Sequence, residues 1–163
     1  AAGGAGRTRR GGAGVKRELV LKNDAAELAR LAAEVTLFGE EAGLGEEAVH
    51  DLRLALEEAV SNIVRYAYRD RDEHLVRVRL AREGRGLSVE VADDGVPFNP
   101  LCVPPPDISR PLGEREPGGM GIYLVRHSMD SIEYRRDGET NLLTMTKDLG
   151  PAEEGRGQGP PPR

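Results

Sequence analysis

Leu54-Ala55-Leu56-Glu57-Glu58-Ala59-Val60-Ser61-Asn62-Ile63-Val64-Arg65-Tyr66 is the stretch that decides the fold, because its apolar residues recur at helical spacing. At about 100° per residue, one broad helix face collects the apolar side chains Val49, Leu52, Leu56, Ala59, Val60, Ile63 and Ala67. Glu58 and Asn62 are one turn apart on a different face, so their side chains are neighbours. A carboxylate and a carboxamide at this spacing can serve a nucleophile and a hard cation in one place, because Mg²⁺ prefers oxygen ligands. Taken alone, such a pair is more often part of a solvated helix face, so the downstream motifs decide its meaning.

The composition limits the classes of protein to which the chain can belong. Its 163 residues fit one domain that buries its own core. The net charge of −5 gives no reason to expect nucleic acid or an anionic membrane as a direct partner. Cys102 is the only cysteine, so no intrachain disulfide can form and we expect a reducing compartment. No apolar run approaches the ~20 residues needed to span a bilayer, and we therefore expect a cytoplasmic protein.

The two ends of the chain differ in composition from its centre. Residues 1–15 are almost entirely Gly, Ala, Arg and Thr, and residues 150–163 are rich in Gly and Pro. Such segments bury too little apolar surface to recover their ordering entropy, so we expect both to be disordered tails. The predicted folded domain is residues 16–149.

Hydrophobic periodicity and turn residues predict the order strand, helix, helix, two strands, helix, two strands. Strands are expected over residues 18–22, 75–80, 87–91, 132–134 and 142–146. Helices are expected from a cap at Asn23 or Asp24 to Gly43, from Gly45 to near Tyr68, and from Gly121 to Met129. Helices gathered on one face of a mostly antiparallel, mixed sheet make an α+β, two-layer α/β sandwich.

Two glycine motifs lie downstream of the central helix. Asp93-x-Gly95 closes a strand, where a carboxylate can accept a hydrogen bond from the exocyclic amine of adenine and a glycine allows close approach of the backbone. Gly119-x-Gly121 opens a helix, where free N–H groups and the helix dipole favour phosphate. Between them, residues 96–117 are rich in proline and glycine without sustained periodicity, which is acceptable within a compact domain when the segment is a functional lid.

Together these motifs resemble the ATP-binding fold shared by DNA gyrase, ninety-kilodalton heat-shock chaperones, histidine kinases and mismatch-repair ATPases. Within that superfamily the chain resembles the bacterial anti-sigma factor serine kinases over residues 17–149. The three boxes that carry the resemblance are Glu58-Ala-Val-Ser-Asn62, Asp93-Asp-Gly95-Val-Pro-Phe98 and Gly119-Met-Gly121-Ile-Tyr-Leu-Val-Arg126.

The resemblance implies a role for three residues of the central helix. Glu58 would be the general base, Asn62 would bind the Mg²⁺ of MgATP, and Arg65 would contact a phosphate. Tyr66 stands where several anti-sigma kinases have histidine, which leaves the partner and the rate open.

For the base, the resemblance implies that Asp93 reads adenine and that Gly95 admits it. Thr140 corresponds to a threonine that helps the aspartate to hold adenine. The chain departs from the family there, because Glu139 stands where the family has glycine.

For the phosphates, the resemblance implies that Gly119 and Gly121 close the lid. Arg110 or Arg115 would contact the γ-phosphate.

We therefore expect an ATP-dependent protein serine/threonine kinase that phosphorylates a serine of an anti-anti-sigma (STAS-type) partner and regulates a sigma factor. Relatives suggest a homodimer. The alternative is a non-catalytic domain that uses ATP as a switch and sequesters a partner by stoichiometric contact. A histidine-kinase catalytic domain is disfavoured because so few residues precede the first predicted strand, and gyrase-like mechanics are disfavoured by size.

Overall fold

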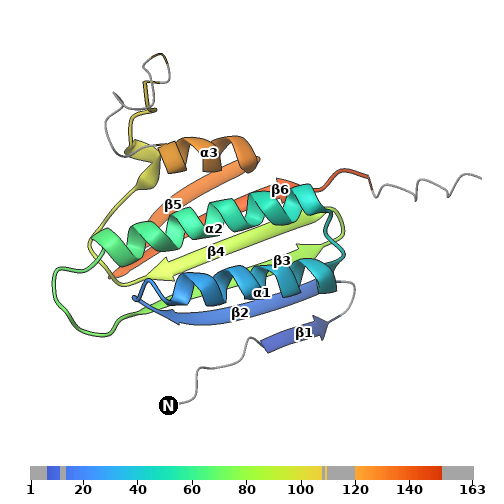
Figure 1. Cartoon of the computed structure of the whole chain (residues 1–163), viewed down its shortest axis with the longest axis horizontal. Helices are drawn as coiled ribbons and strands as arrows, with labels where there is room; N and C mark the ends of the chain where they lie inside the picture. Colours follow the sequence, from blue (N-terminus) through green and yellow to red (C-terminus); the bar gives the residue numbers. More distant parts are fainter. Residues whose placement is uncertain (1–6, 12–13, 108, 110–119, 152–163) are drawn as a thin grey trace, which may run out of the picture.

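The structure, a computed structural model, describes residues 7–11, 14–107, 109 and 120–151. It has two layers, in which helices cover one face of a six-stranded sheet of order β1-β2-β3-β4-β6-β5 (Figure 1). The strands are β1 (Arg7–Gly11), β2 (Gly14–Lys22), β3 (Leu75–Glu83), β4 (Gly86–Asp93), β5 (Ser131–Asp137) and β6 (Thr140–Asp148). The helices are α1 (Glu27–Ala42), α2 (Glu46–Tyr66), α3 (Met120–Ser128) and the short 3₁₀ helix η1 (Pro100–Cys102). The predicted α+β sandwich is confirmed, and every described strand pair is antiparallel, so the mixed character expected of the sheet is not found.

The core lies between the sheet and the helices. Alternate residues of β2, β3 and β4 point toward the helices and are almost fully buried. The residues of α1 and α2 that face these strands are buried as well. The largest of them are Phe38, Leu19, Leu21, Leu31, Leu52, Leu56, Leu80 and Leu87. Each side chain of this size contributes ~1.5–3 kcal/mol when it is removed from water. α1 and α2 cross closely at Gly39, where an added Cβ would lie 2.6 Å from Val49 Cγ2.

Glycines end the elements where the sequence places them. Gly43 has φ +61° and terminates α1 in the left-handed conformation that glycine adopts at little cost. Gly84 and Gly138 each have φ +58° in the β3–β4 and β5–β6 hairpins, between strands that the sequence predicts. The start of α1 differs from the expected cap at Asn23 or Asp24, because Ala26 occupies the N-cap position and the Asp24 carboxylate accepts from the backbone N–H of Ala26, before the first turn of the helix.

The amino-terminal segment differs from its prediction. Residues 7–11 and 14–15 fall within the tail that composition marks as disordered, yet they form β1 and the beginning of β2. Backbone hydrogen bonds to the edge of β2 stabilise a strand without requiring apolar side chains, and composition does not report them. The predicted carboxy-terminal tail lies outside the described residues from position 152 onward.

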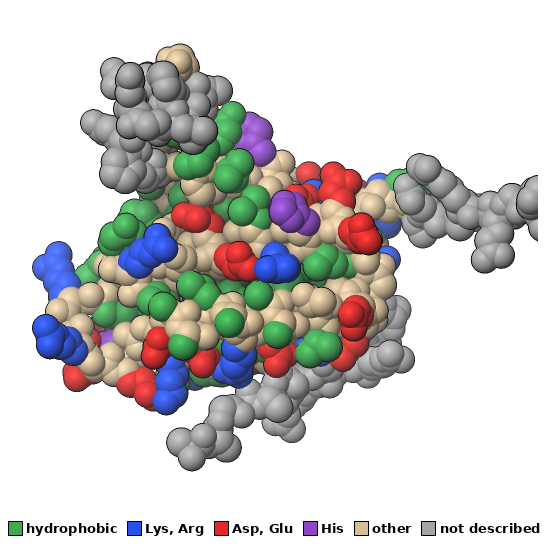
Figure 2. Space-filling view, viewed as in Figure 1, with side chains coloured by type: hydrophobic (Ala, Val, Ile, Leu, Met, Phe, Trp, Pro, Cys, Tyr) green, Lys and Arg blue, Asp and Glu red, His purple; other side chains and the backbone are tan. Residues whose placement is uncertain are grey.

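α2 runs across the sheet and carries the pair that the sequence singles out. Its buried face packs on the strands, while Glu58 and Asn62 are half-buried on the flank of the helix. Space-filling shows acidic and basic side chains interspersed over the helical face of the molecule (Figure 2). No described helix combines the length and the apolar composition that a membrane crossing requires.

Candidate functional site

A pocket opens between the carboxy-terminal half of α2, α3 and the ends of β4, β5 and β6. Its walls are mainly apolar and include Ala59, Ile63, Val91, Val96, Pro97, Ile122 and Leu143. The residues with polar side chains that line it are Asn62, Asp93 and Asn141, together with the tyrosines Tyr66 and Tyr134. An apolar pocket with a few convergent polar groups is typical of a small-molecule site.

Asp93 ends β4 at the floor of this pocket and is only 7% exposed. Its Oδ1 accepts hydrogen bonds from the Gly95 backbone N–H at 2.8 Å and from Asn141 Nδ2 at 2.9 Å. Burial raises the pKa of the Asp93 carboxyl above its ordinary value, while these two hydrogen bonds oppose that rise. Within the described part of the chain, Oδ2 has no hydrogen-bond partner, so it can accept from a ligand.

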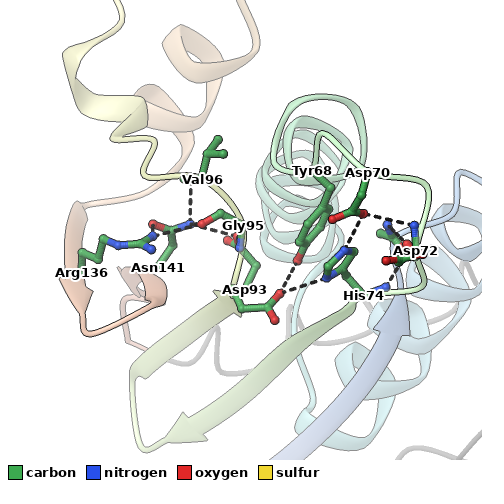
Figure 3. A network of polar contacts seen from close by, with 11 residues as sticks. Tyr68, Asp70, Asp72, His74, Asp93, Gly95, Val96, Arg136 and Asn141 are labelled. Carbon is green, nitrogen blue, oxygen red and sulfur yellow. Dashed lines mark hydrogen bonds and ion pairs between the residues drawn. The ribbon is translucent and has the colours of Figure 1, made fainter.

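Asn141, which the sequence reasoning missed, organises the floor of the pocket. It lies directly opposite Asp93 in the β4–β6 ladder and is 5% exposed. Besides Asp93, its Nδ2 donates to the carbonyl oxygens of Gly95 at 3.3 Å and Val96 at 3.0 Å (Figure 3). Its Oδ1 accepts from the Tyr134 hydroxyl and from Arg136 Nη1, each at 2.7 Å.

Thr140 does not occupy the place expected for it. The residue is exposed, pairs with Asp137 beside the hairpin turn, and does not line the pocket. Successive residues of a strand point to opposite faces, so Thr140 and Asn141 cannot both face the pocket. Counting the β5–β6 register back from the Asp137-Gly138 turn could have found Asn141, because this residue, and not Thr140, has the parity of the buried side.

Gly95 is constrained by the end of α2. An added Cβ would lie 2.5 Å from Ala67 Cβ and 2.7 Å from the Ala67 carbonyl oxygen. The Val96 backbone N–H donates to that same carbonyl at 2.8 Å. The close approach that the structure shows is to Ala67 at the C-cap of α2, and the approach of a base to Gly95 stays a prediction.

Glu58 lies against Gly121 one helical turn before Asn62, between the pocket that Asn62 borders and the groove between α1 and α2 that Glu58 borders. A Cβ on Gly121 would overlap the Glu58 carboxylate, so the first turn of α3 rests directly on that group. Asn62, one turn further along α2, borders the pocket. Within the described residues, neither the Glu58 nor the Asn62 side chain has a hydrogen bond or an ion pair.

The described residues can supply a magnesium ion with one or two oxygen ligands, but not with a full set. The described residues contain no group of three or more His, Cys, Asp or Glu side chains that could enclose a metal. Mg²⁺ is commonly held by one or two protein oxygens together with water and substrate phosphates. The unengaged carboxamide oxygen of Asn62, with the Glu58 carboxylate one turn away, meets that requirement.

Arg65 is not brought to the pocket. It is exposed and borders a separate groove between α1 and α2, which it shares with Glu58, Arg53 and Glu57. The remaining predicted phosphate contacts, Arg110, Arg115 and Gly119, lie outside the described residues.

A second polar cluster lies where the loop after α2 meets the loop after β4, adjacent in the chain to Ala67 and Asp93 of the pocket lining (Figure 3). The Tyr68 hydroxyl donates to Asp94 at 3.0 Å, and His74 stacks on the Tyr68 ring with centroids 3.9 Å apart. His74 Nε2 lies 2.8 Å from Asp70 Oδ1. The hydrogen bond to Asp70 raises the pKa of His74 and lowers that of Asp70, while burial raises the pKa of Tyr68.

The chain is similar in sequence to known bacterial protein kinases. The chain is 33% identical to the serine/threonine-protein kinase BtrW of Bordetella bronchiseptica over 100 residues, which are 61% of this chain and 70% of BtrW. It is 36% identical to the serine-protein kinase RsbW of Bacillus thuringiensis over 107 residues, which are 63% of this chain and 66% of that protein.

A solved structure, that of the RsbU and RsbW domains of Rv1364c from Mycobacterium tuberculosis, matches with a TM-score of 0.54 at 16% identity. The match covers 81% of this chain and 32% of that one, and at this identity it supports the fold alone. Residues 21–147 match the family described as the histidine kinase-like ATPase domain. Asn62 and Asp93, from two of the three sequence boxes, border one pocket, and the chain belongs to the histidine kinase-like ATPase domain family.

Proposed function

We propose that the protein is an ATP-dependent serine/threonine kinase of the anti-sigma type, acting in the cytoplasm on a serine of an anti-anti-sigma (STAS-type) partner and thereby regulating a sigma factor. The observation that carries the proposal is the state of Glu58: a half-buried carboxylate without a partner among the described residues, covered by Gly121 and one turn from Asn62. The names of the relatives, a serine/threonine-protein kinase and a serine-protein kinase, support the same chemistry. A homodimer, as the resemblance suggests, is part of the proposal.

The pocket divides the binding of a nucleotide between its two ends. Asp93 Oδ2 accepts from the exocyclic amine of adenine, and the apolar walls formed by Val96, Ile122 and Leu143 enclose the ring. Toward the other end, Asn62 offers its carboxamide oxygen to Mg²⁺. When bound, Mg²⁺ supplies neutralisation of the phosphate charge.

Glu58 then acts on the acceptor hydroxyl. The serine oxygen forms a bond to the γ-phosphorus as the bond from that phosphorus to the bridging oxygen breaks, and ADP leaves. Glu58 accepts the proton that the hydroxyl loses, and Gly121 leaves the space that the carboxylate occupies. Phosphoryl transfer demands mainly positioning and charge stabilisation, which is what a preformed pocket supplies.

The test is transfer of labelled γ-phosphate from ATP to purified STAS-type proteins of the source cell, with calorimetry of nucleotide binding in parallel. Glu58→Gln keeps the size of the side chain but removes the proton acceptor, and we expect the transfer rate to fall by roughly 10²–10⁴-fold with nearly unchanged ATP affinity. Glu57→Gln is the matched control, because Glu57 forms only an exposed ion pair with Arg53 at 3.2 Å. Transfer by Glu58→Gln at the wild-type rate would remove Glu58 from the chemistry. Binding of ATP and of a partner with no transfer by the wild type would instead favour the non-catalytic switch.

A further inference from the structure

A single row of polar side chains crosses three strands on the pocket side of the sheet. The ladder pairs Asp93 of β4 with Asn141 of β6, and Asn141 in turn with Arg136 of β5. Carboxylate, carboxamide and guanidinium therefore stand side by side, and hydrogen bonds join each to the next. The Asp93 end of the row borders the pocket, and the Arg136 end is exposed.

Arg136 fixes which way the carboxamide of Asn141 points. A guanidinium can only donate hydrogen bonds, so the Asn141 atom that faces Arg136 Nη1 must be the oxygen. The Tyr134 hydroxyl donates to the same oxygen. The amide nitrogen is thereby turned toward Asp93 Oδ1 and the carbonyl oxygens of Gly95 and Val96.

The fixed amide determines what Asp93 can offer to a ligand. Its Oδ1 receives two donors, the Asn141 Nδ2 and the Gly95 backbone N–H, so that oxygen has no room for a proton of its own. Both hydrogen bonds favour the ionised carboxylate, in which Oδ2 is an acceptor bordering the pocket. An acceptor at this position attracts an amino group, which donates a hydrogen bond to it. It repels a carbonyl oxygen, because Asp93 Oδ2 and that oxygen would then face each other with no hydrogen between them.

We propose that Arg136 and Tyr134 are positioning residues for base recognition, which act through Asn141 to keep the pocket floor an acceptor and so to select a purine carrying an exocyclic amine over one carrying a carbonyl. The proposal rests on the nucleotide binding proposed above and adds how the base is discriminated. Arg136 also donates to the Gly95 carbonyl at 3.1 Å, so the same side chain holds the loop that carries the pocket wall.

The experiment measures the affinities of ATP and inosine triphosphate, which presents a carbonyl where ATP presents an amine, by calorimetry on the full chain. We expect the wild type to prefer ATP by roughly 100-fold or more, because a polar site rejects an analogue that leaves buried groups unpaired. Arg136→Met should weaken ATP binding by roughly 10-fold and leave the weak binding of inosine triphosphate nearly unchanged, so that the ratio falls. Arg136→Lys, which retains charge and donors, should restore most of the ratio. Arg135→Met is the matched control, because Arg135 is exposed on the opposite face of the same strand.

A second set of variants tests the amide itself. Asn141→Thr and Asn141→Val have the same shape and differ by one hydroxyl donor, so Thr should retain more of the preference for ATP than Val. In Asn141→Asp, a proton shared by two carboxylates would restore a donor between them, so ATP affinity should rise as the pH falls from 8 to 6, a trend that the wild type lacks.

Equal weakening by Arg136→Met and Arg135→Met, or equal factors for the two nucleotides, would overturn the positioning role while leaving ATP binding intact. Tyr134→Phe provides the same readout with a change that preserves packing. A wild-type protein that binds neither nucleotide would overturn the proposed function and this inference together.

Discussion

The two ends of the pocket satisfy their polar groups in opposite ways. At the base end, Asp93 and Asn141 are buried and held by hydrogen bonds from several elements, so their geometry exists before any ligand arrives. At the other end, Asn62 borders the pocket and Glu58 lies one turn away against Gly121; both side chains are half-buried and have no partner within the described residues. The base end is therefore preorganised for binding, whereas the polar groups at the Glu58 end have their hydrogen-bonding capacity open among the described residues.

The largest expected effect removes the acceptor from the preorganised end. Asp93→Asn places an amide where the adenine amine needs an acceptor, so two donors would face each other without a partner. We expect ATP affinity to fall by roughly 100-fold or more with little change in the thermal midpoint, because the amide oxygen still accepts from Gly95 and Asn141. Calorimetry on this variant and on Asp94→Asn, its exposed neighbour, is the measurement. An unchanged dissociation constant in Asp93→Asn would exclude the carboxylate from base recognition.

The next prediction compares two glycine substitutions, Gly95→Ala near Asp93 and Gly121→Ala next to Glu58. Gly95→Ala would drive a methyl group into the Ala67 backbone carbonyl, and we expect it to lower the free energy of unfolding by ~1–3 kcal/mol. For Gly121→Ala the nearest described atoms belong to the flexible Glu58 side chain, and alanine favours a helix by ~0.5–1 kcal/mol over glycine. Gly121→Ala should therefore keep or raise stability while phosphoryl transfer falls by roughly 10-fold or more, since Glu58 must move. Denaturation and transfer assays on both variants are needed. If the free energy of unfolding fell by a similar amount in both variants, both glycines would be required for packing.

A smaller effect is expected from Asn62→Ala. This variant loses a carboxamide oxygen but no internal hydrogen bond among the described residues, so the fold should be unaffected. ATP affinity measured in Mg²⁺ should fall by roughly 10-fold, and the difference between Mg²⁺ and EDTA should shrink, because one oxygen ligand is gone. The same measurement on Ser61→Ala, whose residue lies beside Asn62 but borders the α1–α2 groove, controls for local packing. Full retention of the Mg²⁺ effect in Asn62→Ala would assign the metal contact elsewhere.

The smallest effect concerns the polar cluster formed by Tyr68, His74, Asp70 and Asp94. The Asp70 hydrogen bond raises the pKa of His74 above its ordinary value of 6.5, and Asp94 and Asp72 act in the same direction against an opposing effect of burial. A raised folded-state pKa contributes stability that is complete below 6.5 and is lost as the pH rises through the folded value. Urea denaturation from pH 5.5 to 8.5 should show a decline in wild-type stability over this range that His74→Gln lacks. His50→Gln is the control, and a decline that persists in His74→Gln would move its origin to another group.

The sequence predicts the positions of Glu58 and Asn62 on their helix, but at the base end it predicts Asp93 and misses Asn141. Helical periodicity places Glu58 and Asn62 on one flank of α2 without any tertiary information, and Gly43, Gly84 and Gly138 mark element ends through their own backbone preferences. Asn141 depends on strand register, where a shift of one residue exchanges the two faces, and no single-residue signal separates it from Thr140.

Two further features lie beyond local sequence. β1 depends on hydrogen bonding to the open edge of β2, although its composition matches that of a disordered tail. The need for glycine at position 95 comes from Ala67, which the fold brings there from the end of another element. Local patterns thus predict helices and turns, whereas pairing and close approach require the fold as a whole.

The Asp93–Asn141 hydrogen bond joins residues 48 positions apart, and the segment between them includes η1 and α3. Bringing the ends of such a loop together costs chain entropy that grows only with the logarithm of its length, about 0.6 kcal/mol for each doubling. Insertions or deletions in the irregular residues 103–107 therefore change the stability of the base end very little. Natural or engineered variants can alter the length of chain that leads into α3 while β4 and β6 still hold Asp93 opposite Asn141.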